Sequence, residues 1–223
     1  MITALKSITS GAYVSRGSMT GYDELLIARS ENIILTKEPL GRSHLIGLNG
    51  ASKHRRPYQK LVADVSEFRY GNKSQDERVY LEPILELFNG EVLAFNISNH
   101  PTVEFAVKPL KEALNQIPVL DYRTTVHTDQ GFQYQHHHWQ IVLKDHRAFQ
   151  SMSRKATCLG NAAMESFFYI MKVEVIDEQF ETKVALIKAM TEWIDFYNHR
   201  RIKTKLGGKS PVKYRELTAQ KAV

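Results

Sequence analysis

Alternating hydrophobic and polar positions first become regular near residue 61 and predict three consecutive β-strands, at 61–70, 79–88 and 91–97. Asn89-Gly90, between the last two, is a strong signal for a tight hairpin turn. Pro83 has no N–H to donate to a β-ladder, so it predicts a bulge or a position without a ladder donor in the second strand. We therefore expect an antiparallel meander.

Helices and short strands alternate after this meander. Apolar residues that recur every three or four positions predict four helices, the first capped by Thr102: 102–115, 135–144, 161–176 and 183–198. Two short strands are expected at 124–128 and 148–152. This order matches an α/β, ribonuclease H-like mixed sheet, in which three antiparallel strands precede alternating helices and strands and further helices follow. In that architecture the first strand lies centrally, beside strand 124–128.

The same pattern divides the chain into three parts. Residues 1–57 show no sustained period and end in a basic run closed by Pro57, which predicts a linker. Residues 58–199 contain the regular pattern and are expected to form the folded core. Residues 200–223 are expected to be a basic C-terminal tail.

Composition narrows the class of protein. Hydrophobic residues make up 43% and charged residues 24% of the 223 positions, which is ordinary for a globular protein in water. The net charge of +6 suits a polyanionic partner, and a mildly basic solvated surface explains it equally well. Cys158 is the only cysteine, which excludes an intrachain disulfide. Because no apolar run approaches the ~20 residues of a membrane span, we expect a cytoplasmic protein without membrane contact.

Three acidic residues stand where a strand or a helix would fix their direction. Asp64 lies within an apolar strand, Asp129 ends strand 124–128, and Glu165 begins helix 161–176. Taken singly, they have plain structural explanations: a solvent-facing acid, a turn-forming Asp and a solvated helix face. Carboxylates that converge from separate elements repel each other unless cations neutralise them. Convergence would therefore indicate two divalent ions, Mg²⁺ or Mn²⁺ rather than zinc, and phosphodiester chemistry.

Two groups of histidines offer further chemistry. His136, His137 and His138 are adjacent, so on a helix they are expected to point in different directions and to act as surface or phosphate contacts, not as metal ligands. His127 shares a strand face with Asp129, where a hydrogen bond near the site and a purely structural role are both open.

The segment after residue 199 is strongly basic. Seven Lys or Arg residues and no acid lie between residues 200 and 215: Arg200, Arg201, Lys203, Lys205, Lys209, Lys213 and Arg215. Such a tract binds phosphates with an affinity that falls as salt rises, and a solvated basic tail is the alternative.

Several motifs, in order, resemble those of bacterial insertion-sequence transposases of the retroviral-integrase type. The segment Ser151-Met-Ser-Arg-Lys-Ala-Thr-Cys-Leu-Gly-Asn-Ala-Ala-Met-Glu165-Ser-Phe-Phe resembles the last acidic motif of that family. The segment His127-Thr-Asp-Gln-Gly-Phe-Gln-Tyr-Gln resembles a middle motif, and Phe196-Tyr-Asn-His-Arg-Arg resembles the start of its C-terminal signature. The likeness covers roughly residues 58–216.

The resemblance implies a DDE transposase with an integrase-like catalytic core at 58–199. It implies catalytic and metal-binding roles for Asp64, Asp129 and Glu165, nicking at the ends of the element, and strand transfer by the freed 3′-hydroxyl. It also implies DNA as partner and a homo-oligomer assembled on DNA. The residues expected to contact DNA are Arg154, Lys155, Asn161, Lys172, Arg200, Arg201, Lys203 and Lys205.

Two departures from the family pattern keep other hypotheses open, as does the lack of resemblance between residues 1–52 and the family's usual upstream, DNA-binding portion. Gly160 replaces the acid that usually precedes the last motif's helix, and Ala156 stands where glycine is usual. A truncated or decayed copy that binds DNA without catalysis is therefore the alternative. A structure-specific ribonuclease H-like nuclease, which shares the metals but lacks the joining step, is a third hypothesis.

Overall fold

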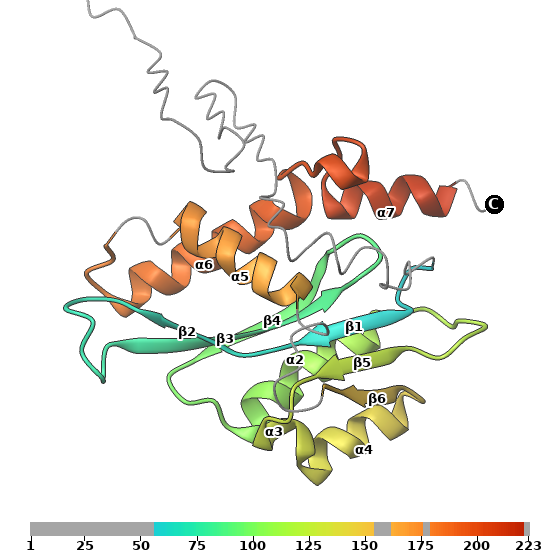
Figure 1. Cartoon of the computed structure of the whole chain (residues 1–223), viewed down its shortest axis with the longest axis horizontal. Helices are drawn as coiled ribbons and strands as arrows, with labels where there is room; N and C mark the ends of the chain where they lie inside the picture. The colour runs from blue at the N-terminus through green and yellow to red at the C-terminus, as the bar shows by residue number, and fades with distance from the viewer. Residues whose placement is uncertain (1–55, 154–161, 176–178, 221–223) are drawn as a thin grey trace, which may run out of the picture.

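The computed structural model describes residues 56–153, 162–175 and 179–220; the expectation for 1–57 lies almost wholly outside them. These residues form a six-stranded mixed sheet (Figure 1). Its strands are β1 (Lys60–Ala63), β2 (Ser66–Arg69), β3 (Arg78–Glu86), β4 (Val92–Ser98), β5 (Thr125–Thr128) and β6 (Phe149–Met152).

Helices cover both faces of this sheet. The helices α2 (Val103–Asn115), α3 (Phe132–Gln135) and α4 (His137–Asp145) lie on one side (Figure 1). The helices α5 (Ala162–Val175) and α6 (Lys183–His199) lie on the other, with the short 3-10 helix η2 (Thr204–Leu206) and α7 (Pro211–Gln220) beyond them. Thr102 caps α2 by accepting a hydrogen bond from the Phe105 N–H, as its sequence position predicted.

The predicted strand 61–70 is two strands in the structure. β1 pairs antiparallel with β3 at Ile84–Glu86, and β2 pairs with the same strand at residues 78–81. The chain therefore runs along one edge of β3 but leaves the ladder at Asp64 and Val65, where the Val65 N–H donates to the Asp64 carboxylate at 2.8 Å.

The opposite edge of β3 pairs with β4 across the predicted hairpin. Gly90 in this turn has a φ of +74°, which glycine adopts without strain. The β3–β4 register shifts between Ile84 and Leu85, so the predicted bulge lies in this strand, one residue beyond Pro83, which itself pairs in register with Phe95.

β1 lies at the centre of the sheet. It pairs parallel with β5, with Leu61 opposite Val126 and Val62 opposite His127, and β5 pairs parallel with β6. The first strand therefore lies beside the strand that follows the first long helix, which confirms the ribonuclease H-like mixed sheet. β1, β5 and β6 run parallel and end at neighbouring positions, so the residues that follow these strands lie at the same edge of the sheet.

Two hydrophobic cores hold the helices against the sheet. Val62 faces a core with α5 and α6 that includes Met164 and Phe167. Leu61 and Ala63, which point the other way because strand side chains alternate, face a core with α2, α3 and α4. The sheet is therefore buried on both faces at β1.

The structure corrects two expectations about helices. The single helix predicted at 135–144 is the pair α3 and α4, separated by His136, whose backbone is extended (φ −71°, ψ 145°). Residues 211–220 form α7, where a basic tail was expected. α7 packs on α6, and Arg215 donates to both carboxylate oxygens of Glu91, at 2.6 and 2.9 Å. Across the described residues, no helix has both the length and the apolar character needed to cross a bilayer.

Candidate active site

Asp64 lies just beyond the last residue of the central strand. Continuing the β1–β5 register from Val62 and His127 brings Asp64 opposite Asp129. Strand alternation also places Asp64 on the same face as Val62, which is the face that α5 covers. The first two predicted site residues therefore come from neighbouring strand ends.

Asp129 is held by the turn that follows β5. Its carboxylate accepts a hydrogen bond from the Gly131 N–H at 2.8 Å. A Cβ at Gly131 would lie 3.0 Å from that carboxylate and 2.8 Å from the Gln133 amide, so glycine leaves room for the turn. Its φ is negative, so spacing, not a left-handed backbone, explains this glycine.

Glu165 is presented by α5, the helix that covers the face of the sheet to which Val62 points. It is exposed in the first turn of α5, while Met164, Phe167 and Met171 of that helix are buried against the sheet. These apolar positions were predicted from their spacing, and they fix the helix that presents Glu165.

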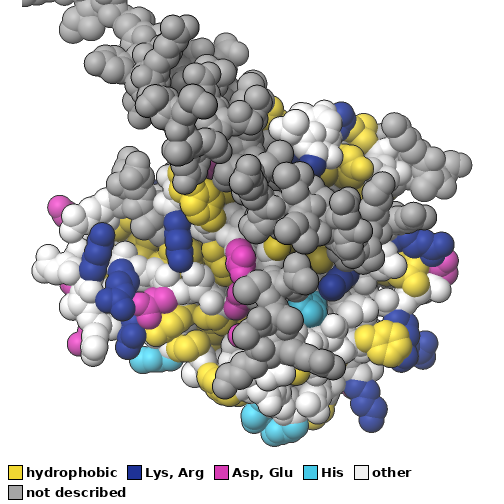
Figure 2. Space-filling model, viewed as in Figure 1, with side chains coloured by type: hydrophobic (Ala, Val, Ile, Leu, Met, Phe, Trp, Pro, Cys, Tyr) yellow, Lys and Arg dark blue, Asp and Glu magenta, His cyan; other side chains and the backbone are white. Residues whose placement is uncertain are grey.

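Electrostatics links Asp64 to the other two acids. Burial raises the pKa of Asp64 first, the charges of Asp129 and Glu165 raise it further, and the Val65 N–H lowers it. The result is a pKa of about 6, against an ordinary value of 3.8. The charges of Asp129 and Glu165 thus add to the effect of burial in disfavouring the ionised form of Asp64. The face drawn in Figure 2 carries acidic side chains near its centre and a group of Lys and Arg side chains to their left.

A fourth acid lies beneath this cluster and was missed by the sequence analysis. Glu82 of β3 is fully buried, and the Tyr134 hydroxyl donates to its two carboxylate oxygens at 3.0 and 2.9 Å. Burial raises the pKa of Glu82 well above its ordinary value, and the charges of Asp64 and Asp129 add to this effect. The only sequence signal was an acid inside an apolar strand.

The Tyr134 contact also ties the Asp129 turn to the sheet. Tyr134 lies in α3, directly after this turn, and its backbone carbonyl accepts a hydrogen bond from Gln150 of β6 at 2.7 Å. Together with Glu82, this bond anchors α3 to strands on both sides of β5, which positions the loop that carries Asp129.

His127 takes a structural position. Its two ring nitrogens contact the hydroxyls of Ser151 at 2.9 Å and Ser153 at 3.3 Å, on or just after β6. Burial, followed by the charge of Lys60, lowers the pKa of His127, so the ring is neutral near pH 7. Of the two roles left open, the structure favours the structural one, in which the His127 ring links β5 to β6.

The basic residues expected to contact DNA fall into two groups. Lys172 is exposed on α5, with its ammonium 5.4 Å from the centre of the Phe68 ring. Arg200 and Lys205 are also exposed. These three occupy positions from which a side chain can reach a phosphate.

Arg201 and Lys203 are buried and do not occupy such positions. Arg201 is 1% exposed and donates to Glu174 of α5 at 2.9 Å. Lys203 is 4% exposed, and its ammonium donates to the Tyr197 hydroxyl and lies 4.1 Å from the centre of that ring. Their burial contradicts the expectation of phosphate contacts: both cations support the packing of the chain after α6.

Several predicted positions lie outside the described residues. They are Arg154, Lys155, Asn161 and the two departures from the family pattern, Ala156 and Gly160.

Comparisons of the sequence with known proteins identify its family. Residues 54–158 and 165–218 each match a family model described as integrase core domain. The chain is 38% identical over 167 residues to the transposase InsK of insertion sequence element IS150 from Escherichia coli K12, covering 74% of this chain and 57% of InsK. It is 41% identical over 160 residues to a transposase-like protein of Haemophilus influenzae, covering 71% of each. The chain thus spans little more than half the length of InsK.

Solved structures with a similar fold are retroviral integrase cores. The catalytic core domain of HTLV-2 integrase in complex with magnesium aligns with a TM-score of 0.56 at 16% identity, covering 71% of this chain and 96% of that core. The catalytic core domain of BIV integrase aligns with a TM-score of 0.55 at 16% identity, covering 74% and 99%. At this identity the likeness concerns the fold alone. The sequence relatives supply the family: the chain belongs to the integrase-core transposases of bacterial insertion sequences.

Proposed function

We propose that this chain is the catalytic core of a DDE transposase, which nicks DNA at the ends of an insertion sequence and joins the freed 3′-hydroxyls to target DNA. The observation that carries the proposal is the parallel β1–β5 register, which brings Asp64 opposite Asp129 on the sheet that α5, the helix of Glu165, covers. Burial and the charges of Asp129 and Glu165 raise the pKa of Asp64, which agrees with this placement. Carboxylates crowded in this way oppose folding, so the arrangement is most simply explained by a bound cation.

The ligand set fits Mg²⁺ or Mn²⁺. Asp64, Asp129 and Glu165 offer carboxylate oxygens only, which these ions prefer over zinc. We propose that Asp64, Asp129 and Glu165 would together hold two such ions. When bound, the ions would lower the pKa of the attacking water or 3′-hydroxyl and stabilise charge on the leaving oxygen. The magnesium complex of the HTLV-2 core, which shares the fold, supports this choice of ion.

The chain's own contribution is to hold these carboxylates in place. Asp64 is oriented by the Val65 N–H and Asp129 by the Gly131 N–H, each at 2.8 Å. Glu165 stands on a helix anchored by buried apolar residues. Groups fixed before the substrate arrives need little reorganisation during the reaction, which is how rigid positioning lowers a barrier.

DNA would cross the exposed face of α5. Lys172 lies seven residues, or about two turns, beyond Glu165 on the same helix face, and Tyr169 between them is 52% exposed. A cation and an aromatic ring side by side suit a phosphate and a base near a DNA end. Arg200 and Lys205, which are exposed, are further candidates for phosphate contacts, and Arg154, Lys155 and Asn161 stay in the proposal through the family resemblance. A homo-oligomer on DNA remains part of the proposal.

A branched DNA that mimics the joined product tests the chemistry directly. Strand transfer is a transesterification and can run in reverse, so the purified chain with Mg²⁺ or Mn²⁺ should release one strand and reseal the other. Glu165→Gln should lower this rate by at least about 10³-fold, as loss of a principal electrostatic group does. Glu67→Gln is the matched control, because Glu67 is a nearby acid already paired with Arg69 at 2.7 Å.

The alternative is a decayed copy that binds DNA without catalysis, and Gly160 and Ala156 favour it. It predicts salt-sensitive DNA binding and no resealed strand with either ion. Activity that appears in Gly160→Asp would identify decay from an active ancestor. Cleavage of the branched DNA without resealing would instead identify a nuclease, and Glu165→Gln that stays fully active would reject the proposed site.

A further inference from the structure

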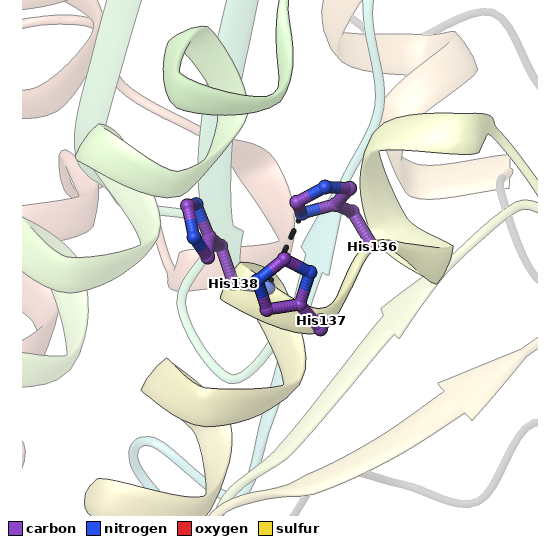
Figure 3. Close-up of side chains that lie close together, drawn as sticks. All are labelled: His136, His137 and His138. Carbon is purple, nitrogen blue, oxygen red and sulfur yellow. Dashed lines mark hydrogen bonds between the residues drawn. The ribbon is translucent and has the colours of Figure 1, made fainter.

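The three adjacent histidines come together at the start of α4. His137 and His138 are the first residues of the helix, whereas His136 precedes it in an extended conformation. The change of backbone conformation turns the His136 ring back over the first turn of the helix, so the three rings face one another (Figure 3). The expectation that they point in different directions is therefore wrong, because it assumed that all three were helical.

Their ring atoms are close enough for one small ion. One nitrogen from each ring lies within 4.8 Å of the others. Metal–nitrogen bonds of about 2.0–2.1 Å in a tetrahedral site need nitrogens roughly 3.3 Å apart. His137 and His138 are exposed, so rotation of their side chains can close the difference without moving the core.

We propose that His136, His137 and His138 form a surface site for a single transition-metal ion of the class that prefers imidazole, namely Zn²⁺, Ni²⁺ or Cu²⁺, with water completing the coordination. Imidazole nitrogen favours these ions, whereas Mg²⁺ and Mn²⁺ prefer the oxygens of the carboxylate cluster. The site is thus chemically separate from the one formed by Asp64, Asp129 and Glu165, and it does not rest on the proposed function.

Metal binding at this site would change the start of α4. The His136 ring caps the helix, because its Nδ1 accepts the His138 N–H at 3.3 Å. A neutral imidazole has one lone pair. If the ion binds Nδ1, that lone pair is used; if it binds Nε2, the proton moves to Nδ1. Either way the cap is released, so binding is linked to the first turn of α4 next to the buried Trp139.

Titration calorimetry of the whole chain with NiCl₂ and with ZnCl₂ tests the site, in excess MgCl₂ to occupy the carboxylates. We expect one saturable ion per chain. His138→Ala should weaken binding by at least about tenfold, the scale of effect seen around metal sites. His136→Asn should also weaken it while keeping a good helix cap. His100→Ala is the matched control, because His100 is an exposed histidine outside the cluster.

A second measurement follows the rings themselves. Side-chain imidazole signals in NMR spectra should shift with Zn²⁺ for the three clustered histidines and not for His100. Circular dichroism confirms that each variant is folded. Absence of saturable binding by the wild-type chain, or equal binding by wild type and His138→Ala, would overturn the proposal. DNA joining plays no part in either readout, so failure here leaves the proposed function untouched.

Discussion

Helix α5 carries two glutamates that the fold treats in opposite ways. Glu165, in the first turn, is exposed, and its charge helps to raise the pKa of Asp64. Glu174, in the last turn, has an 8% exposed side chain and accepts hydrogen bonds from Arg201 and Trp193, each at 2.9 Å. An acid buried together with its cation belongs to the framework, whereas acids that crowd one another create a demand that a ligand can meet.

Two lysines show the same contrast between a buried charge and an exposed one. Lys203 is buried, where its ammonium contacts the Tyr197 hydroxyl and the Gly90 carbonyl. Lys172 is exposed over the Phe68 ring, on the helix that presents Glu165. Two lysines with the same charge therefore have different roles in the fold. Variants at these positions can distinguish a lysine that stabilises the chain from one that is available to bind DNA.

The largest effect on stability is expected at Glu174. Glu174→Ala would leave the Arg201 guanidinium buried without its carboxylate, which lowers the free energy of unfolding by about 3–5 kcal/mol. Urea denaturation followed by circular dichroism measures this change. Glu192→Ala is the control, because its pair with Lys188 is exposed at 3.9 Å, and such a helix pair contributes about 0.3–0.5 kcal/mol. A loss below about 1 kcal/mol in Glu174→Ala would contradict the comparison.

Asp64→Asn should act in the opposite direction and stabilise the chain when no divalent ion is present. A pKa raised from 3.8 to about 6 means that the folded chain disfavours the charged carboxylate by ~3 kcal/mol. The folded state binds the proton more tightly than the unfolded state. The stabilising contribution of protonated Asp64 is therefore complete below about pH 4 and is lost as pH rises through about 6.

Unfolding measured from pH 4 to pH 8 in EDTA checks this sign. As pH rises across that window, the free energy of unfolding of the wild type should fall relative to that of Asp64→Asn. The difference between the two should be largest above pH 6. Adding MgCl₂ at pH 8 should narrow the gap, because the ion stabilises only the chain with the intact carboxylate. A variant less stable than wild type in EDTA at pH 8 would show that Asp64 is a framework acid like Glu174.

The smallest effects concern the two lysines. Lys172→Ala should weaken DNA binding across all sequences and reduce the slope of log affinity against log salt by about 1, with no change in stability. Lys203→Met should leave that slope unchanged and lower stability by about 1–3 kcal/mol, since it removes buried hydrogen bonds from a charged group. Fluorescence anisotropy at several salt concentrations and urea denaturation measure the pair. Interchanged results would reverse the assignment of the two residues.

Local pattern predicted most of the fold. The helix 102–115 with its Thr102 cap, the hairpin at Asn89-Gly90 and the buried apolar positions of α5 all depend on neighbours within a few residues, and the structure confirms them. Two errors share one cause. The break at Asp64 and the extended His136 interrupt segments whose composition alone favours continuity, so only pairing with β3 and packing on α2 reveal them.

The residues of the candidate site could be proposed from the sequence, whereas the residues that hold them in position could not. Asp64, Asp129 and Glu165 could be proposed because they lie on separate elements expected to converge and because the flanking motifs resemble those of the family, although each alone has a plain structural explanation. Glu82 and Tyr134 did not stand out, because their hydrogen bond joins residues 52 positions apart. Such a contact leaves no trace in local spacing.

By itself, the sequence determined most of the order of strands and helices, the choice of candidate acids and the family, because periodicity and ordered motifs are properties of neighbouring residues. The tertiary structure alone decided which charges are buried. Arg201 and Lys203 lie in the same basic tract as Arg200 and Lys205, yet the first two are enclosed and the others are exposed. The difference arises because burial depends on distant partners: Glu174, 27 residues before Arg201, makes its burial possible.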